Sequence, residues 1–348
     1  MHNVPPAAVD HLRAVLDVPD LTGTKYRLVE RIATGGMGSI YLVEDTSLDR
    51  RVALKIVTSP LPSAELARRL LKEAQIVARL EHPGIVPIHD VGTLADGRIF
   101  YTMKYVQGRR LDDYAREYRS PQNLLRLFQK ICEAVAFAHA NGVIHRDLKP
   151  ENIMVGSFGE VLVMDWGVAK MLTEAGTVPH LPSSDRDSRH AAETQDGTIV
   201  GTPAYMSPEQ ARGDLAVLDE QTDMYALGAI LYFLLTGRPP FEGSSSDEIR
   251  KRVLHEEPRR PRVLDPNIPR PLEEMALKAM AKNPALRYAG VEALASDVIR
   301  HLDGQPVSAY RETLFERLDR WVEKNRFLIF LIVAYLLMRV FTFLMMGR

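Results

Sequence analysis

Apolar residues follow a strand-like pattern in the first part of the chain and a helical pattern in the second. Short apolar runs bounded by turn residues predict strands over Tyr26–Val29, Ile40–Val43, Val52–Lys55, Ile85–Val91 and Arg98–Tyr105. Ser63–Leu80 interrupts these runs, because its apolar residues fall on one helical stripe. From Leu111 the spacing becomes helical, and Asn123–Ala140 is a long amphipathic segment. Further helices are expected at Ser246–His255, Arg270–Ala281 and Gly290–Leu302. At roughly 150 residues per domain, the 348 residues accommodate about two lobes.

The pattern changes again beyond Gly304. A helix is expected over Arg311–Arg326, with four large apolar residues on one face: Leu314, Leu318, Trp321 and Val322. Glu316 and Arg320 are expected to form an ion pair across one turn of this helix. The sequence therefore predicts an amphipathic juxtamembrane segment over 305–326.

Phe327–Met346 is almost entirely apolar. Its twenty residues, at 1.5 Å rise each, would cover roughly 30 Å, the thickness of a bilayer core. Five Lys and Arg residues lie in 311–326 and one, Arg348, follows the apolar stretch, which by the positive-inside rule favours a cytoplasmic location for the preceding residues. We therefore expect a single-pass transmembrane helix over 327–346. Arg339 opposes this interpretation, at roughly 2.5–3.5 kcal/mol for a central position, and the alternative is an apolar helix docked on the protein itself.

Composition and charge narrow the class of protein only slightly. A hydrophobic fraction of 46% and a charged fraction of 26% are those of a globular protein, and a formal net charge of -1 gives no reason to expect nucleic acid as a partner. The single cysteine, Cys132, excludes an intramolecular disulfide and a cysteine zinc cluster, and its apolar surroundings predict a buried side chain rather than a reactive thiol. No charged start followed by an apolar run is visible at the N-terminus, so we expect no secretory signal.

The strongest chemical signal is the stretch His145–Asn152, which reads His-Arg-Asp-Leu-Lys-Pro-Glu-Asn. Thirteen residues after Asn152 comes Asp165-Trp166-Gly167. Phosphoryl transfer needs such a set: a carboxylate that accepts a hydroxyl proton, a cation beside the migrating group, and oxygen ligands for magnesium. Upstream, a glycine cluster over Thr34–Gly38 precedes an apolar strand that ends in Lys55, as expected where backbone N–H groups and one lysine approach phosphates.

Together these motifs resemble, in order, those of the protein kinase superfamily, and among its members the bacterial eukaryotic-like Ser/Thr kinases. The resemblance covers about Tyr26–Leu302. It implies an α+β, two-lobed protein kinase fold, with a small β-rich N-lobe over 26–106 and a larger helical C-lobe over 107–304, so that the kinase domain is 26–304. Residues 1–25 are expected to form an N-terminal tail.

The resemblance also implies ATP and Mg²⁺ as cofactors, with Mn²⁺ able to take the place of Mg²⁺. The residues expected around the nucleotide are Ala33, Thr34, Gly35, Gly36, Met37, Gly38, Ile40, Ala53, Lys55, Glu73, Met103, Lys104 and Val106. Of these, Lys55 held by Glu73 would position the phosphates, Met103 would be the gatekeeper, and the backbone from Lys104 to Val106 would bind adenine. Ala33 stands where the family pattern has its first glycine.

The same resemblance assigns roles in the reaction. Asp147 would accept the substrate's hydroxyl proton, Lys149 would stabilise charge on the transferred group, and Thr202 would help to position both. Asn152 and Asp165 would hold the metal. Lys149 and the Gly201-Thr202 pair are typical of the Ser/Thr form of the pattern, so protein Ser and Thr hydroxyls are the expected substrates.

Three further residues are expected to be architectural. Glu209 and Arg287 match a buried ion pair of the kinase fold, and Asp223 would brace the backbone of the catalytic loop.

Thr173–Gly197 is polar and occupies the position of the activation segment, where phosphorylation is expected to order the chain through Arg146; an unmodified insert is the alternative. The candidate phosphate acceptors are Ser183, Ser184, Ser188, Thr194 and Thr198.

Two rival functions remain at this point. A pseudokinase that only binds or scaffolds is suggested by Ala33 and by Trp166, which replaces the usual Phe, although the residues that carry the chemistry are all present. A small-molecule kinase is disfavoured by Gly201–Glu209, which resembles a peptide-docking segment. Protein substrates and membrane lipid are the expected partners, and dimerisation through 311–346 or back-to-back small lobes is left open.

Overall fold

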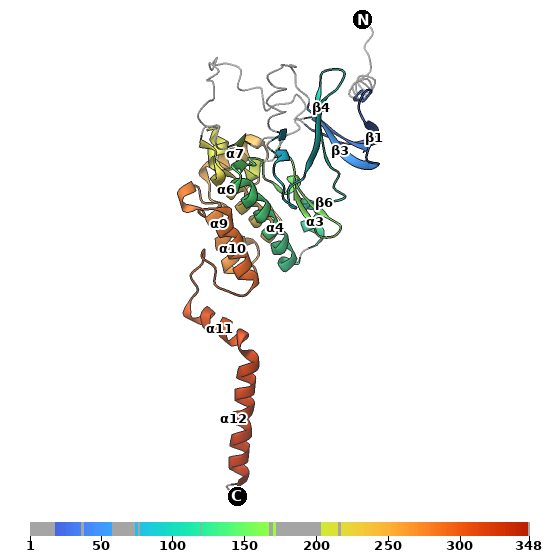
Figure 1. The fold of residues 1–348 in the computed structure, drawn as a ribbon. Coiled ribbons are helices and arrows are strands. Elements are labelled where there is room, and N and C mark those ends of the chain that lie inside the picture. The colour runs from blue at the N-terminus through green and yellow to red at the C-terminus, as the bar shows by residue number, and fades with distance from the viewer. Residues whose placement is uncertain are drawn as a thin grey trace.

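The computed structural model describes residues 18–35, 38–57, 74–75, 77–118, 120–166, 170–171, 203–214 and 217–346. Two lobes are visible, a β-rich one built from the first part of the chain and a helical one built from the second, and a long helix extends away from the helical lobe (Figure 1). The order of strands and helices agrees with the two-lobed kinase fold expected from the sequence.

The N-lobe is a five-stranded antiparallel sheet. Its strands are β1 (Tyr26–Gly35), β2 (Gly38–Asp45), β3 (Arg50–Val57), β4 (Ile88–Thr93) and β5 (Ile99–Lys104), in the spatial order β1-β2-β3-β5-β4. Alternation along the strands buries one face, where Tyr41, Leu54 and Phe100 are among the residues that form the core of the lobe. The register sets Lys55 opposite Tyr101 and Ala53 opposite Met103, so the side chains expected around a nucleotide come from neighbouring strands.

The strand predicted over Ile85–Val91 forms later in the chain, as β4 (Ile88–Thr93). Ile85 forms only an isolated bridge to Val163, and the strand begins at Ile88.

A small sheet lies where the two lobes meet. It consists of β6 (Gly108–Arg110), β8 (Ile153–Gly156) and β9 (Val161–Val163), paired antiparallel in the order β6-β8-β9. A second pair joins β7 (Val143–Ile144) to β10 (Lys170–Met171). The catalytic stretch predicted from the sequence therefore runs from the end of β7 to the start of β8, with the short helix η1 (Pro150–Asn152) inside it.

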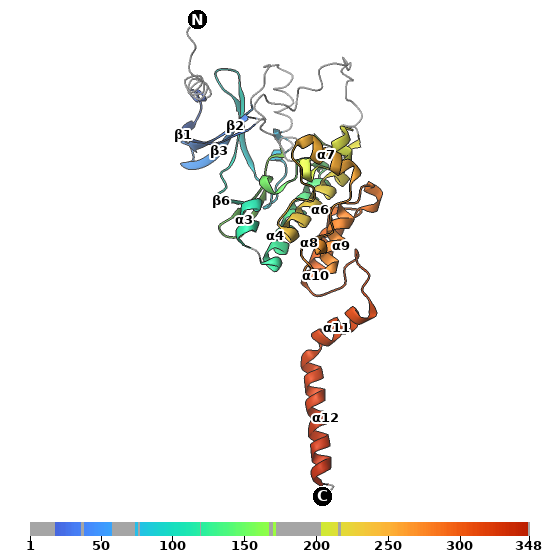
Figure 2. The same ribbon diagram turned by 180° about the vertical axis from the view of Figure 1, so that it is seen from behind.

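The C-lobe is helical, and a buried central helix organises it. This helix is α6 (Glu220–Thr236), which is apolar on all sides and is capped by Asp219 at its start and by Gly237, at φ 71°, at its end. It packs against α4 (Pro121–Ala140) and α9 (Arg270–Ala279), and α10 (Val291–Leu302) packs on α4 (Figure 2). Among the described residues, the lobe also contains α3 (Leu111–Glu117), α5 (Pro208–Arg212), α7 (Ser246–His255) and α8 (Pro261–Leu264), with the short turns η4 (Pro203–Tyr205) and η6 (Pro284–Leu286).

Cys132 is fully buried in α4, as its surroundings predicted. Burial raises the pKa of its thiol, which keeps it protonated and unreactive.

The chain leaves the C-lobe through an anchor on α10. The carboxylate of Asp297 is buried and accepts hydrogen bonds from the hydroxyls of Tyr288 (2.9 Å) and Ser308 (2.8 Å) and from the backbone N–H groups of Ser308 (2.7 Å) and Ala309 (3.1 Å). Four donors on one buried carboxylate hold the segment after α10 against the lobe.

Two helices follow this anchor, α11 (Leu314–Lys324) and α12 (Arg326–Met346). The predicted ion pair between Glu316 and Arg320 is wrong. Glu316 instead accepts from the backbone N–H and hydroxyl of Thr313 (2.8 and 2.9 Å), which caps the first turn, and Arg320 pairs with Glu312 at 2.6 Å. The cap satisfies a backbone donor that would otherwise lack a partner, so it outcompetes an exposed ion pair.

The stretch predicted to span a membrane does form a helix, α12, and it extends away from the two lobes (Figure 1). Within the part of the chain that the structure describes, no helix combines the length and the apolar character needed to cross a membrane. The expected transmembrane helix over 327–346 is therefore not supported. Within the predicted stretch, Arg339 is the charged residue whose insertion would be costly.

Candidate active site

Asp223 binds the backbone at the start of the predicted catalytic loop, His145–Asn152. This residue lies in α6 and is fully buried. Its carboxylate accepts from the backbone N–H groups of His145 (2.7 Å) and Arg146 (2.8 Å), and from the ring of His139 (2.8 Å). Burial by itself would raise the pKa of Asp223, but the hydrogen bond and charge of His139 and the donors of the loop outweigh it, so the pKa is lowered. Asp223 thus braces the loop as the sequence predicted.

His145 has a defined tautomer because both ring nitrogens have partners. Nε2 lies 2.8 Å from the carbonyl oxygen of Met164 and must donate to it, while Nδ1 accepts from the backbone N–H of Asp147 at 3.2 Å. The ring therefore links the catalytic loop to the segment that carries Asp165.

Arg146 lies in the left-handed region at φ 70°, which costs a non-glycine residue roughly 1–2 kcal/mol. Such a conformation persists only where neighbouring contacts impose it.

Asp147 lies at the centre of a compact polar group. Its Oδ2 accepts from Lys149 Nζ at 2.8 Å and from Asn152 Nδ2 at 3.0 Å, and Asn152 Nδ2 also donates to the Asp147 carbonyl at 2.8 Å. The Asp147 side chain is 34% exposed, so the carboxylate is fixed yet reachable. Within the described residues these contacts leave Oδ1 as the oxygen that can receive a hydroxyl.

Lys55 reaches across from the N-lobe and forms an ion pair with Asp165. Its side chain is only 7% exposed and its Nζ lies 6.0 Å from the centre of the Tyr101 ring. Burial alone would lower the pKa of Lys55, but Tyr101 and the Asp165 carboxylate outweigh it, so the pKa is raised and the side chain remains a cation. A buried cation that faces a carboxylate is suited to bind a phosphate.

Asn152 and Asp165 are brought together by β8 and β9. Ile153 pairs with Val163, and the backbone N–H of Met164 donates to the Asn152 carbonyl at 2.8 Å, so the two side chains emerge from adjacent positions. Because Nδ2 of Asn152 is occupied by Asp147, the amide presents its oxygen. One carboxylate and one amide oxygen fit Mg²⁺, which is bound through few protein ligands together with substrate phosphates. No group of three or more His, Cys, Asp or Glu side chains that could hold a metal occurs among the described residues.

Trp166, the residue that departs from the usual Phe, is 3% exposed and belongs to the core of the C-lobe. Its indole N–H donates to the Val163 carbonyl at 3.1 Å, and its ring lies 4.6 Å from that of His145. The larger side chain is accommodated without displacing Asp165 from Lys55.

The apolar residues expected around adenine form one cluster. Ala53, Met103 and Val106 are buried together with Val86 and Leu162, and Ile40 packs against them from β2. The backbone N–H of Lys104 donates to the Pro87 carbonyl at 3.2 Å and is therefore not a donor to a nucleotide. An apolar cluster bordered by backbone groups and by Lys55 suits a flat heterocycle that carries phosphates.

The glycine loop is described in part. Ala33 and Thr34 are exposed and pair with Ile40 and Ser39, and Gly38, at φ 133°, adopts a conformation that favours glycine. Gly35 pairs with Gly38 in the hairpin. Four predicted site residues, Gly36, Met37, Glu73 and Thr202, lie outside the described residues, as do Thr173–Gly197 and Gly201.

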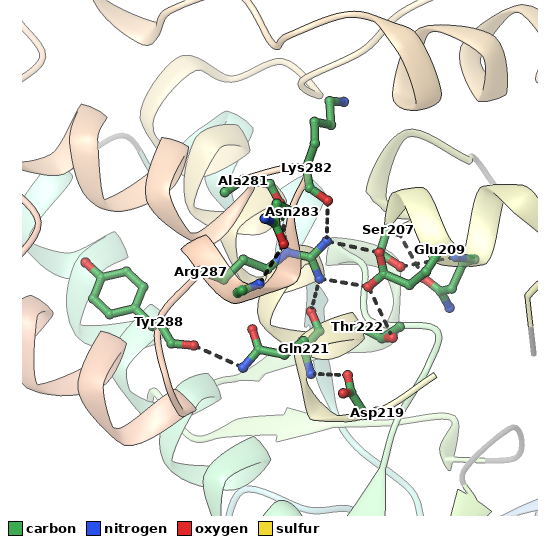
Figure 3. Close-up of polar contacts among 12 residues, drawn as sticks. Ser207, Glu209, Asp219, Gln221, Thr222, Ala281, Lys282, Asn283, Arg287 and Tyr288 are labelled. Carbon is green, nitrogen blue, oxygen red and sulfur yellow. Dashed lines mark hydrogen bonds and ion pairs between the residues drawn. The ribbon is translucent and has the colours of Figure 1, made fainter. Parts of the chain in front are cut away.

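The predicted Glu209–Arg287 pair joins α5, which contains Glu209, to the C-terminal end of η6 (Figure 3). The carboxylate accepts from Nη1 at 2.7 Å and from Nη2 at 3.0 Å, and the Arg287 side chain is fully buried. Burial by itself would raise the pKa of Glu209, but the two guanidinium hydrogen bonds outweigh it and lower the pKa.

Two residues near the site escaped the sequence reasoning, His139 and Gln210. His139 donates to Asp223, and Gln210 donates to the Arg146 carbonyl at 2.6 Å. The pattern Ser207-x-x-Gln210 does signal a capped helix start, but nothing in the sequence indicates the contact with Arg146.

Comparison with known proteins agrees with this geometry. Residues 26–299 match the family described as protein kinase domain. The chain is 38% identical over 298 residues to the serine/threonine-protein kinase PknD of Protochlamydia amoebophila, covering 80% of this chain and 30% of that protein. It is 37% identical over 296 residues to the serine/threonine-protein kinase PrkC of Bacillus subtilis, covering 84% and 43%. The crystal structure of the M. tuberculosis PknI kinase domain matches with a TM-score of 0.60 at 26% identity, covering 80% of this chain and 96% of that one.

The chain thus spans less than half the length of these two curated relatives. The family match includes every residue of the catalytic group described above. The chain therefore belongs to the protein kinase family, and its kinase domain is of the kind found in bacterial serine/threonine protein kinases.

Proposed function

We propose that this kinase transfers the γ-phosphoryl group of ATP to Ser and Thr hydroxyls of proteins. The observation that carries the proposal is the arrangement of Asp147, Lys149 and Asn152 on one side of the site, with the Lys55–Asp165 pair on the other. Each group matches a need of phosphoryl transfer, which depends mainly on positioning and on electrostatic stabilisation.

In this mechanism, Asp147 Oδ1 orients the substrate hydroxyl and takes its proton as the hydroxyl oxygen bonds to the γ-phosphorus. The bond from that phosphorus to the β–γ bridging oxygen breaks, and ADP leaves with the negative charge. Lys149, 2.8 Å from Asp147 Oδ2, lies where it can stabilise the transferred phosphoryl group, and Thr202 is proposed to assist this pair. Lys55 binds the remaining phosphates, with Glu73 as its proposed second partner. Asn152 and Asp165 are the residues that would hold Mg²⁺, or Mn²⁺ in its place, which neutralises phosphate charge when bound.

We propose further that the adenine lies against Ala53, Met103 and Val106, below Ile40, with the glycine loop from Ala33 to Gly38 covering the phosphates. The kinase domain is proposed to be 26–304, with lobes 26–106 and 107–304. Autophosphorylation is proposed in the activation segment, at one or more of the candidate acceptors Ser183, Ser184, Ser188, Thr194 and Thr198.

The test is phosphorylation by the full chain with labelled ATP and magnesium, alongside Asp147→Asn. The change keeps the shape of the side chain but removes the proton acceptor, so label on the protein is expected in the wild type only. Equal label in both proteins, or none in the wild type with good Ser/Thr substrates, would favour a pseudokinase and reject the proposal.

We also propose that the kinase attaches to a membrane, with the catalytic domain on the cytoplasmic face. Support comes from large apolar side chains that are exposed around both C-terminal helices, among them Phe315, Trp321, Phe330 and Leu337. The full chain is expected to sediment with lipid vesicles. Its release into the supernatant would instead favour burial of these side chains against protein, including a second copy of the chain.

A further inference from the structure

We propose that Gln210 is a positioning residue for Asp147, and that it acts through the peptide bond between Arg146 and Asp147. The inference rests on the proposed function, since it names a further residue that the transfer needs. Gln210 lies in α5, 64 residues from the loop that it contacts, and its Nε2 donates to the Arg146 carbonyl at 2.6 Å.

The peptide unit that leads into Asp147 is held at both of its polar ends. Its carbonyl accepts from Gln210, and its N–H, which belongs to Asp147, donates to His145 Nδ1 at 3.2 Å. Arg146 itself is in the left-handed region at φ 70°, and its own N–H donates to Asp223 Oδ1 at 2.8 Å. A strained residue returns toward a favoured conformation when a contact is lost, and rotation of this peptide unit would turn the Asp147 carboxylate. Asp223 restrains the unit before Arg146, and Gln210 restrains the unit after it.

Gln210 is itself held rigidly. Its side-chain Oε1 accepts from the backbone N–H of Ser207 at 3.0 Å, and its backbone N–H donates to the Ser207 hydroxyl at 3.3 Å. These two hydrogen bonds form a capping box at the start of α5. Ser207 is fully buried, and the adjacent Glu209 is bonded to Arg287. Both ends of the side-chain amide are therefore used, the oxygen for the cap and the nitrogen for the catalytic loop.

Because the amide oxygen and the amide nitrogen of Gln210 have different partners, Gln210→Glu removes one contact and keeps the other. A glutamate accepts from the Ser207 N–H as well as glutamine does, so the cap is kept, but it has no donor for the Arg146 carbonyl. The matched control is Gln221→Glu. Gln221 donates through Nε2 to the Tyr288 carbonyl at 3.0 Å, in the same lobe and near the Glu209–Arg287 pair, where it is drawn in Figure 3.

The experiment measures kcat, KM for ATP and melting temperature of the full chain in three proteins: wild type, Gln210→Glu and Gln221→Glu. Misplacement of a catalytic group costs up to about a hundredfold in rate, so kcat of Gln210→Glu should fall roughly ten- to a hundredfold with KM for ATP unchanged. The control, Gln221→Glu, should have the kcat of the wild type and a melting temperature similar to that of Gln210→Glu. Equal kcat in the two variants, or a loss that follows the melting temperature in both, would overturn the positioning role.

Hydrogen exchange of the peptide that contains 143–149 provides a readout independent of activity. Gln210→Glu should exchange faster there than wild type and Gln221→Glu, because the bonded N–H of Asp147 loses its fixed orientation. If the wild type proved inactive, the proposed function would fail, yet faster exchange would still support the positioning role. Unchanged exchange would reject that role whether or not the protein is active.

Discussion

The Arg287 guanidinium is buried and fully hydrogen-bonded, so removal of its carboxylate partner should strongly reduce the stability of the fold. A guanidinium has five N–H donors, and all five have an acceptor here. Nε donates to Ala281 O (2.8 Å), Nη1 to Glu209 and to Gln221 O (2.6 Å), and Nη2 to Glu209 and to Lys282 O (3.5 Å), as Figure 3 shows. The three carbonyls carry no net charge, so Glu209 is the one residue in the described part of the chain that pairs with the buried cation as an anion.

Glu209→Ala therefore leaves a buried charge without compensation. Loss of one partner of a buried pair costs about 3–5 kcal/mol. For a domain of this size, each kcal/mol lowers the melting temperature by about 2–4 °C, so a fall of roughly 6–20 °C is expected. The assay is thermal and urea unfolding of wild type, Glu209→Ala, and the double variant Glu209→Leu with Arg287→Met. The double variant should be the more stable of the two variants, because it removes both charges.

The acid dependence of stability gives an independent check on the same pair. The pKa of Glu209 is lowered in the folded protein from 4.5, so its contribution is complete above pH 4.5 and is lost as the pH falls through the lower, folded value. Glu209→Gln should therefore show a smaller loss of melting temperature on acidification than wild type. A cost of under about 1 kcal/mol for Glu209→Ala, or a double variant less stable than that single one, would refute the argument that an uncompensated charge is the cause.

Three further changes test other parts of the structure. Trp166→Phe should lose about 1–3 kcal/mol in urea unfolding, because the indole hydrogen bond to Val163 goes and a void remains; an unchanged midpoint would contradict that contact. Lys55→Met should weaken the binding of a fluorescent ATP analogue at least tenfold, which corresponds to about 1.4 kcal/mol of binding free energy. The melting temperature should change little, because the desolvation cost of the buried ammonium disappears together with its ion pair. Unchanged affinity would show that Lys55 does not bind the nucleotide. Asp297→Ala should speed tryptic cleavage after Arg311, whereas Asp303→Ala, at the exposed end of α10, should not; equal rates would show that the anchor does not hold the segment.

Local patterns in the sequence were enough to predict which polar side chains the catalytic stretch brings together. Asp147, Lys149 and Asn152 lie within one short loop, so their spacing alone brings them together. The brace from Asp223 and the Glu209–Arg287 pair were predicted from the resemblance to kinases and are confirmed by the hydrogen bonds.

The contacts that the sequence did not reveal depend on geometry between distant segments. The bond from Gln210 to Arg146 joins residues 64 positions apart, and its acceptor is a backbone carbonyl, which leaves no trace in residue types. The predicted pairing of Glu316 with Arg320 considered only helical spacing. Thr313-x-x-Glu316 was also a capping pattern, and the need to satisfy a backbone donor at a helix start prevailed. The expectation of a transmembrane helix rested on a run of apolar residues, and no helix among the described residues meets the requirements of length and apolar character for a span.

The Asp297 anchor limits how far the catalytic domain can travel. Only four residues separate Ala309, which the anchor holds, from the start of α11. Within them, the Tyr310 hydroxyl donates a hydrogen bond to the Glu316 carboxylate at 2.9 Å. A chain extends at most about 3.6 Å per residue, so this connection is a short linker and not a long flexible one. The short connection therefore limits the distance that the catalytic loop can move from the C-terminal helices. Which substrate hydroxyls the loop can reach would then depend on where those helices are held.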